Sequence, residues 1–366
     1  MSDVISVGSA YSAGQASVRT DPSRGSPGAE FRSAGAALWL FAVAAIVLGM
    51  VLVGGATRLT GSGLSITQWR PVSGVVPPLN ARDWDRLFAL YRQSSQYRLI
   101  NQGISLSAFQ TLYWWEWGHR LLGRTLGVVF LAPFLVLLAR RALPSRLIPR
   151  CVVLFGLGGL QGLVGWWMVK SGLEGRAAVL PERLATHLGL ALLLLASLIW
   201  TGLEAGWGPV KVRRRDGWTW LGLGLMAALF MQCLLGALVA GNHAGLIDGD
   251  WPRMAGRWFP EGYWQGGALA TFFHGLAAVQ FNHRVMAYAI LIVASVAAVR
   301  AVLTPTLAPA LRTLILILAL GLWGQGALGV ATLWYMAPLP LALAHQVNAS
   351  LMFSLSVVLA WRAQRA

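Results

Sequence analysis

The chain has 366 residues, of which 56% are hydrophobic and only 11% are charged. Charged residues make up about 25% of an ordinary soluble domain, so the composition excludes a soluble globular protein and predicts that lipid is the main solvent. The formal net charge is +16, but the basic residues are spread over short loops instead of forming one patch. This distribution argues against a nucleic-acid-binding protein and is better explained by membrane topology.

The first segment, residues 1–33, is polar and rich in Ser, Gly and Ala. It contains Asp3, Asp21 and Glu30 and has no apolar core of signal-peptide length. A mitochondrial transit peptide is poor in acidic residues, so the segment fits a disordered tail better than it fits a transit peptide. We therefore expect a disordered cytoplasmic tail on a protein of a bacterial inner membrane.

Eight apolar stretches follow, each close to the roughly 20 residues with which a helix crosses a hydrocarbon core. They are centred in Ala36–Gly55, Leu121–Leu138, Val152–Val169, Leu188–Leu203, Trp218–Ala240, Val285–Val302, Leu311–Tyr335 and Leu341–Trp361. An even number of spans puts both termini on one side of the membrane. By the positive-inside rule that side is cytoplasmic, because it holds Arg19, Arg24, Arg32, Arg140, Arg141, Arg146, Arg150, Lys211, Arg213, Arg214, Arg215, Arg362 and Arg365.

The outer loop after the first span contains a short amphipathic segment, Asp83–Tyr91. Its apolar residues Trp84, Leu87, Phe88 and Tyr91 follow the spacing of a helical stripe. We expect a short helix here that lies on the membrane as a lid.

The two halves of the chain repeat each other. Segment Leu160–Gly165 is echoed by Gly324–Gly329, and the same shift of 164 residues carries His119-Arg120 onto His283-Arg284. Four spans in each half bring both halves into the membrane from the same face, so the repeat is parallel. We expect an all-α integral membrane protein whose eight transmembrane helices form two parallel-repeat four-helix bundles, residues 34–205 and residues 206–366.

Four of the six histidines occupy corresponding places at the outer ends of the even-numbered spans, namely His119, His187, His283 and His345. A single histidine at such a place is more often a hydrogen-bonded interfacial residue than a ligand. Four in repeat register favour a ligand role, because ionisable side chains at membrane depth are costly and usually functional. Neutral imidazoles from neighbouring helices suit the two axial positions of a heme iron, so one pair in each half predicts two heme sites.

The other two histidines, His243 and His274, lie outside the repeat, in or near the outer loop between the fifth and sixth spans. We expect surface or structural roles for both. The two cysteines, Cys151 and Cys233, fall near or inside spans far apart in the sequence. They are predicted to be small buried hydrophobic residues and not a disulfide or metal site.

Three segments carry a family resemblance: Thr57–Ser65 with Trp69-Arg70-Pro71, Tyr113–Arg120, and Arg183–Ala185 before His187. Through these segments the chain resembles heme A synthase of the alphaproteobacterial and mitochondrial branch. The resemblance extends from about residue 36 to the C-terminus. The resemblance implies oxidation of the C8 methyl group of heme O to the formyl group of heme A, by successive hydroxylations and loss of water, in support of cytochrome oxidase assembly.

The resemblance also implies what each half binds. Heme b would be the cofactor of the second half, with His283 and His345 as axial ligands, and heme O would be the substrate of the first half, near His119 and His187. Some bacterial members of the family carry a cysteine pair in the first outer loop. This chain has no cysteine between Arg58 and Gly118, which excludes a mechanism that needs such a pair.

Glu116 lies three residues before His119 and four before Arg120. It is interpreted either as an ion pair that stabilises the helix start or as a catalytic carboxylate beside the substrate heme. The matching residue of the second half is Gln280, and this difference favours the catalytic interpretation. Arg120 and Arg284 recur in the repeat and are predicted to bind heme propionates, with lipid phosphates as the alternative.

Two other classes of protein remain open. A non-catalytic diheme b-type electron carrier would use the same four histidines, whereas a transporter built from repeats would not explain them. The expected partners are the heme O substrate and the lipid bilayer. The sequence leaves open a heme O synthase, an electron-transfer protein and a second copy of this chain.

Overall fold

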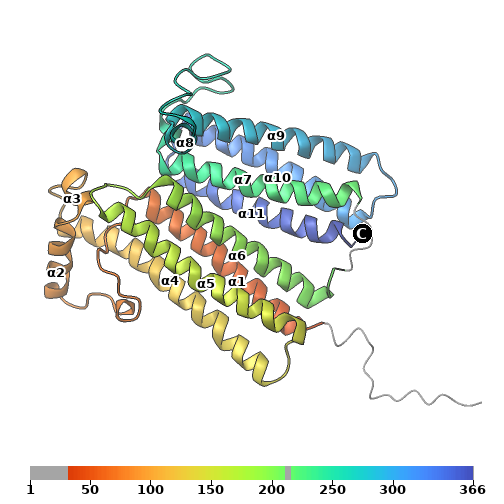
Figure 1. The fold of residues 1–366 in the computed structure, drawn as a ribbon, viewed down its shortest axis with the longest axis horizontal. Helices are drawn as coiled ribbons and strands as arrows, with labels where there is room; N and C mark the ends of the chain where they lie inside the picture. Colours follow the sequence, from red (N-terminus) through yellow and green to blue (C-terminus); the bar gives the residue numbers. More distant parts are fainter. Residues whose placement is uncertain (1–31, 211–215, 366) are drawn as a thin grey trace, which may run out of the picture.

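The computed structural model describes residues 32–210 and 216–365, and within these ranges it contains helices and no β-strand (Figure 1). Eight of the described helices are long and apolar enough to cross a membrane. They are α1 (Ala34–Leu59), α4 (Leu106–Ala139), α5 (Ile148–Leu173), α6 (Pro181–Trp207), α7 (Gly217–Gly241), α9 (Leu276–Val302), α10 (Pro309–Trp334) and α11 (Leu339–Ala363). The predicted all-α, multi-pass membrane protein is confirmed. Nearly all of the predicted tail and the basic stretch Lys211–Arg215 lie outside the described residues.

Several of these helices begin with recognisable start signals. Ser33, Ser105 and Asp216 accept hydrogen bonds at the N-termini of α1, α4 and α7, which satisfies backbone N–H groups that have no partner within the helix. Prolines occupy the first turns of α5, α6, α10 and α11, where a missing N–H costs nothing.

The helices that carry the four histidines begin earlier than the apolar stretches predicted. The helix α4 begins at Leu106, well before Leu121, and α9 begins at Leu276, before Val285. His119 and His283, predicted at the ends of the second and sixth spans, therefore lie inside α4 and α9. Polar and aromatic residues end an apolar stretch at the membrane surface, but the backbone hydrogen bonds of the helix continue through them.

The eight spans pack as two closed rings of four. In the first ring α4 and α6 each contact both α1 and α5, and in the second α9 and α11 each contact both α7 and α10. The rings meet where α6 contacts α7 and α11, and where α1 contacts α11. This packing is what two four-helix bundles would give. That the two bundles arose as repeats of one unit stays a prediction.

The two ends of the rings differ. The short helices α2 (Ala81–Arg92), α3 (Ser95–Leu99) and α8 (Ala268–His274) lie at one end, opposite the C-terminus (Figure 1). At the other end Arg146 and Arg150 bind the buried carboxylate of Glu204, and Arg365 donates to the carbonyl oxygens of Trp207 and Gly208. Arg32 lies at this end too, because it comes just before α1. Four of the arginines predicted to share one side of the membrane therefore lie at the same end: Arg32, Arg146, Arg150 and Arg365.

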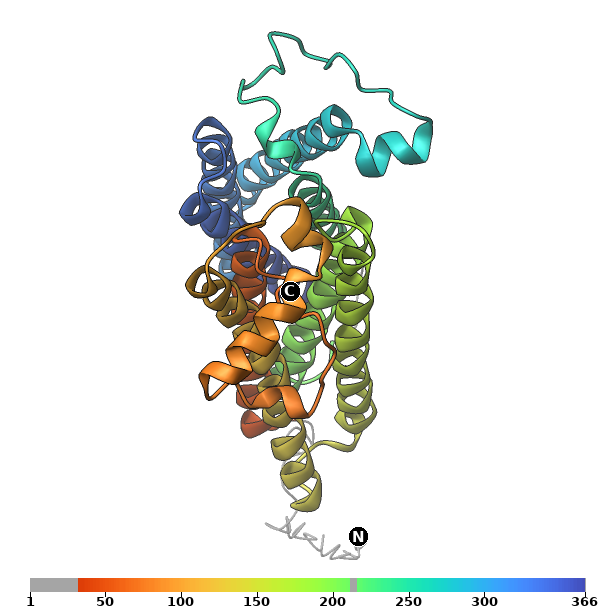
Figure 2. The same cartoon turned by 90° about the vertical axis from the view of Figure 1, so that its left-hand side faces the viewer.

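The amphipathic segment of the first outer loop forms the predicted helix, α2. It lies with α3 across the ends of the first spans (Figure 2). Tyr91 and Phe88 are buried on Phe109 of α4, each with ring centroids 5.1 Å apart, and Trp84 contacts Tyr113 at 5.0 Å. The apolar stripe thus packs on the outer end of α4, close to the helix turn that carries Glu116.

Candidate functional site

Each of the four repeat histidines packs its imidazole against a glycine of the preceding spanning helix. A Cβ atom on that glycine would stand 2.9 Å from histidine Cε1 in three pairs and 3.1 Å in the fourth. A larger residue would therefore displace the imidazole. The pairs are Gly54 with His119, Gly165 with His187, Gly236 with His283, and Gly329 with His345.

A glutamine one helical turn before three of these glycines binds the same histidine. The Nε2 groups of Gln161, Gln232 and Gln325 donate to the backbone carbonyl oxygens of His187, His283 and His345, each at 3.0 Å. In α1 the corresponding residue is Met50. A thioether at this position cannot donate the hydrogen bond that an amide gives to each of the other three histidines.

The imidazoles of His283 and His345 have ring centroids 6.4 Å apart, with an angle of 71° between the ring planes. Because a metal–imidazole bond is about 2 Å long, two imidazoles on opposite sides of one ion have ring centres about 6 Å apart. The pair therefore has the spacing that an iron with two axial histidines needs.

The histidines of the first half also have free ligand capacity. Nδ1 of His119 and Nδ1 of His187 are buried without a hydrogen-bond partner in the described chain. Within the described residues no group of three or more His, Cys, Asp or Glu side chains could hold a bare metal ion. A porphyrin brings four nitrogens of its own, so two imidazoles are enough to complete its iron.

Glu116 is the centre of a buried polar cluster one turn from His119. Its side chain is almost fully buried, and Oε1 accepts from Arg120 at 2.6 Å. Oε2 accepts from Ser65 Oγ and from the backbone N–H of Ile66, both at 2.7 Å. Arg120 also donates to the carbonyl oxygen of Ile66. The i,i+4 ion pair predicted from the sequence is present, and together its two members fix the first outer loop on α4.

The second half fixes its outer loop from the matching positions of α9. Gln280 donates to the carbonyl oxygen of Asp248 at 2.9 Å, and Arg284 donates to the carbonyl oxygens of Asp248, Asp250 and Arg253. The two clusters therefore share their geometry and differ in charge. The structure brings Arg120 and Arg284 onto loop carbonyls. Their binding to propionates stays a prediction, as does the catalytic role of Glu116.

The two remaining histidines contact groups at the outer end. His243 is exposed and lies 3.0 Å from the guanidinium of Arg58. Partial burial and then the charge of Arg58 lower the pKa of His243 below its usual value. His274 lies 3.8 Å from the carboxylate of Glu182. These contacts agree with the surface and structural roles expected for both.

Sequence reasoning missed part of the constellation around the histidines. The four-residue spacing of Gln161 to Gly165 occurs again as Gln232 to Gly236, inside the fifth span. The comparison of the two halves aligned the third span with the seventh and matched the histidines, but it did not align the first span with the fifth. A search within each half would have found a glutamine four residues before the glycine in three of the four helices, and Met50 in its place in α1.

Comparison with known proteins shows the family of the chain. A family model described as cytochrome oxidase assembly protein matches residues 37–357. The chain belongs to this family. It is 50% identical to the heme A synthase of Caulobacter vibrioides over 334 residues, which are 91% of this chain and 97% of that protein.

Two other alphaproteobacterial relatives match over a similar extent. The heme A synthase of Maricaulis maris is 44% identical over 92% of this chain and 98% of its own length. That of Paracoccus denitrificans is 44% identical over 92% of this chain and 90% of its own length. The family resemblance inferred from Thr57–Ser65 and Tyr113–Arg120 is thus confirmed.

Proposed function

We propose that the chain is a heme A synthase, an oxidoreductase that converts the C8 methyl group of heme O into the formyl group of heme A. Two hydroxylations and loss of one water give this change, which in sum consumes one water and releases four electrons and four protons. The observation that carries the proposal is the pair His283 and His345, with ring centroids 6.4 Å apart, in a chain of which more than nine-tenths aligns with relatives named heme A synthase.

The second half is the better fit to a resident heme b, held by His283 and His345. Both of these histidines are fixed by an amide, from Gln232 and Gln325, as suits a group that stays in place. Heme b, when bound there, supplies reversible one-electron transfer.

The first half is the better fit to the substrate, held by His119 and His187. Its loop cluster contains a carboxylate where the second half has Gln280, and His119 has Met50 in place of the amide. The buried Glu116 is held by Arg120 and Ser65 within one turn of His119. A carboxylate fixed in this way stabilises positive charge that develops on the substrate ring, and with Arg120 it keeps the loop closed over the site.

The proposal includes a location in the bacterial inner membrane with both termini in the cytoplasm. Arg146, Arg150 and Arg365 lie at the end where α1 begins and α11 ends, in agreement with the positive-inside rule. The histidines then lie toward the periplasmic side. A heme O synthase that supplies the substrate and an electron acceptor are the partners that this reaction requires.

The test is the heme content of the purified protein. Extracted hemes, separated by chromatography and identified by their pyridine hemochrome spectra, should include heme b together with heme O, its hydroxylated derivative or heme A. Heme b alone, with no conversion of added heme O, would identify an electron carrier. A preparation without heme would favour a transporter.

A further inference from the structure

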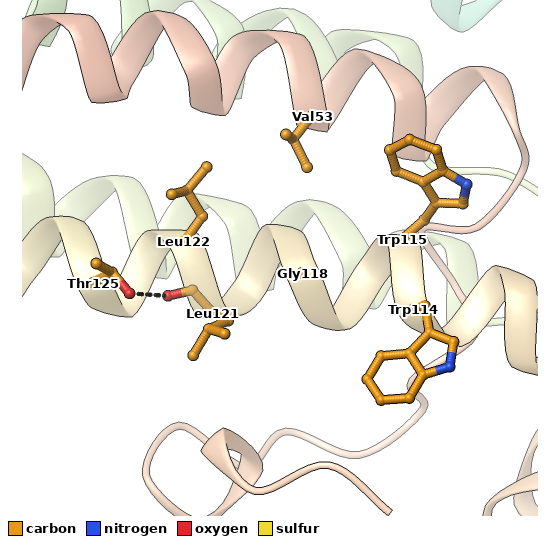
Figure 3. A pocket seen from close by; sticks show the side chains of 7 residues that line it. All are labelled: Val53, Trp114, Trp115, Gly118, Leu121, Leu122 and Thr125. Atoms are coloured by element: carbon orange, nitrogen blue, oxygen red, sulfur yellow. Dashed lines mark hydrogen bonds between the residues drawn. The ribbon is translucent and has the colours of Figure 1, made fainter.

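An apolar groove lies between α1 and α4 (Figure 3). Its volume is about 380 Å³, within the range of about 300–1,000 Å³ that small-molecule pockets have. Val53 of α1 faces Leu122 and Trp115 of α4 across it, and Gly118 leaves a gap between them (Figure 3). The lining residues are Val53, Trp114, Trp115, Gly118, Leu121, Leu122 and Thr125.

Two lining residues are sequence neighbours of the pair that positions the proposed substrate ligand. Gly118 precedes His119 in α4, and Val53 precedes Gly54, the glycine against which the imidazole of His119 packs. From Trp114 to Thr125 the lining residues extend along about 16 Å of helix at 1.5 Å per residue. Trp114 is 44% exposed and Trp115 is 38% exposed. The groove therefore follows a partly exposed apolar face of α1 and α4 and includes the residues that precede His119 and Gly54.

The second half has a polar, covered position at the place that matches Gly118. That residue is Asn282, whose side-chain oxygen accepts a hydrogen bond from Tyr263 of the outer loop at 2.9 Å. The ring of Tyr263 packs on Phe281, with centroids 5.7 Å apart. The residue that matches Val53 is Leu235, which is buried. At these two matching positions the second half does not leave the gap that Gly118 leaves in the first.

We propose that the groove binds the isoprenoid chain of heme O and so selects the substrate, an inference that rests on the proposed function. Heme O differs from protoheme by a hydroxyalkyl group that bears this long apolar chain. If His119 held the macrocycle, Gly118 would be the next residue along α4, and an isoprenoid chain that reached the groove would meet only the uncharged side chains that line it. The burial of apolar surface then favours heme O over protoheme.

The decisive variant is Gly118→Leu. A Cβ atom at Gly118 meets nothing within 4 Å, and leucine favours helix over glycine, so the variant is expected to fold while its side chain fills the groove. The control is Gly127→Leu, the same change in the same helix at an exposed glycine that also has nothing within 4 Å. A second variant, Thr125→Trp, blocks the far end of the groove.

The measurement is an optical titration of the purified protein, in lipid nanodiscs and with heme b bound, against heme O and against protoheme. Wild type and Gly127→Leu should prefer heme O. Gly118→Leu and Thr125→Trp should bind heme O about tenfold more weakly, as expected for the loss of about two buried methylene groups, with unchanged affinity for protoheme.

Equal weakening toward both hemes in Gly118→Leu would show that Gly118 makes room for the macrocycle alone, and would overturn the inference. Unchanged affinity of Gly118→Leu for both hemes would also overturn the inference. The groove would then be a site for a lipid chain of the bilayer. The proposed function fails by a different result, namely that the wild-type protein does not convert heme O. Conversion by wild type, with an unchanged preference in Gly118→Leu, would therefore refute the groove alone.

Discussion

Met50 is the residue at which the first helix pair departs from the other three. In those pairs a glutamine amide donates to the histidine carbonyl oxygen at 3.0 Å. We expect Met50→Gln to supply the same bond to His119, which would order the imidazole and hold the substrate or product more firmly. The fraction of protein purified with heme O or heme A bound should rise, and the rate of heme A release should fall. Chromatography of the extracted hemes measures the first and a heme transfer assay the second.

Met50→Leu is the matched control for this change, since it keeps the apolar character and the approximate volume. If the glutamine and leucine variants retained the same amounts of heme, the amide would have no influence on His119. The methionine would then be only a packing residue of α1.

Glu116→Gln tests the carboxylate of the first-half cluster. Glutamine keeps the size and one acceptor, but the charge is lost, and Arg120, Ser65 and Ile66 must share a single oxygen. Loss of a hydrogen bond to a charged group costs about 1.5–3 kcal/mol, so thermal unfolding should begin at a lower temperature. The protein should still fold and retain heme b, because the second half fixes its loop with Gln280. Cells with this variant should make little heme A and accumulate heme O or the hydroxylated intermediate.

The control for charge is Gln280→Glu, which puts the carboxylate into the second half and should leave heme A production near that of wild type. Wild-type heme A yield from Glu116→Gln would reduce Glu116 to a structural ion pair. The sequence predicted the pair with Arg120 from spacing alone. The bond from the N–H of Ile66 was not predictable, since it depends on where a loop 50 residues away in the chain folds back.

At the level of helix pairs, the glycine that faces each histidine offers a test of which half binds heme b and which binds heme O. Gly329→Ala places a Cβ atom 2.9 Å from Cε1 of His345, and Gly165→Ala does the same to His187. Either imidazole must move by several tenths of an ångström. We expect Gly329→Ala to lower the heme b content, and Gly165→Ala to retain heme b while converting less heme O.

Matched controls exist in the same two helices. Gly324→Ala in α10 and Gly162→Ala in α5 meet nothing within 4 Å, so both should behave as wild type in heme content and in conversion. If Gly165→Ala lost heme b and Gly329→Ala kept it, the assignment of cofactor and substrate to the two halves would have to be exchanged.

The elements themselves show what periodicity can and cannot predict. All eight spans were found from apolar stretches, because lipid demands long uninterrupted apolar runs. The start of α4 at Leu106 was missed because its first turns carry Trp114, Trp115 and Glu116, which hydropathy places outside the membrane. The amphipathic helix α2 was predicted from four residues at helical spacing, since its stripe is continuous.

For the whole molecule, the contact between the two rings joins residues adjacent to both sites. Gln346, which follows His345 in α11, donates to the carbonyl oxygen of Val51 in α1 at 2.7 Å, and its amide lies against Gly55. Gly55 follows Gly54, the partner of His119. At the equivalent contact of the rings Leu188 packs on an apolar cluster that includes Ala237. The sequence predicted two halves, but this asymmetry depends on how they dock and was not visible in it.

Gly55→Ala tests whether the two sites depend on one interface. The added Cβ atom would overlap the amide of Gln346, so this side chain must turn away and lose its bond to Val51, at a cost of about 1–3 kcal/mol for the groups left unpaired. His345 precedes Gln346 in α11, and His119 packs on Gly54, the residue before Gly55. We therefore expect this single variant to lower heme b content and heme O conversion together, whereas each helix-pair variant affects one of them. Gly49→Ala, in the same helix and with nothing within 4 Å, should change neither. Loss of conversion with full heme b content in Gly55→Ala would show that the second site is insensitive to the position of α1, and that the halves bind their hemes independently.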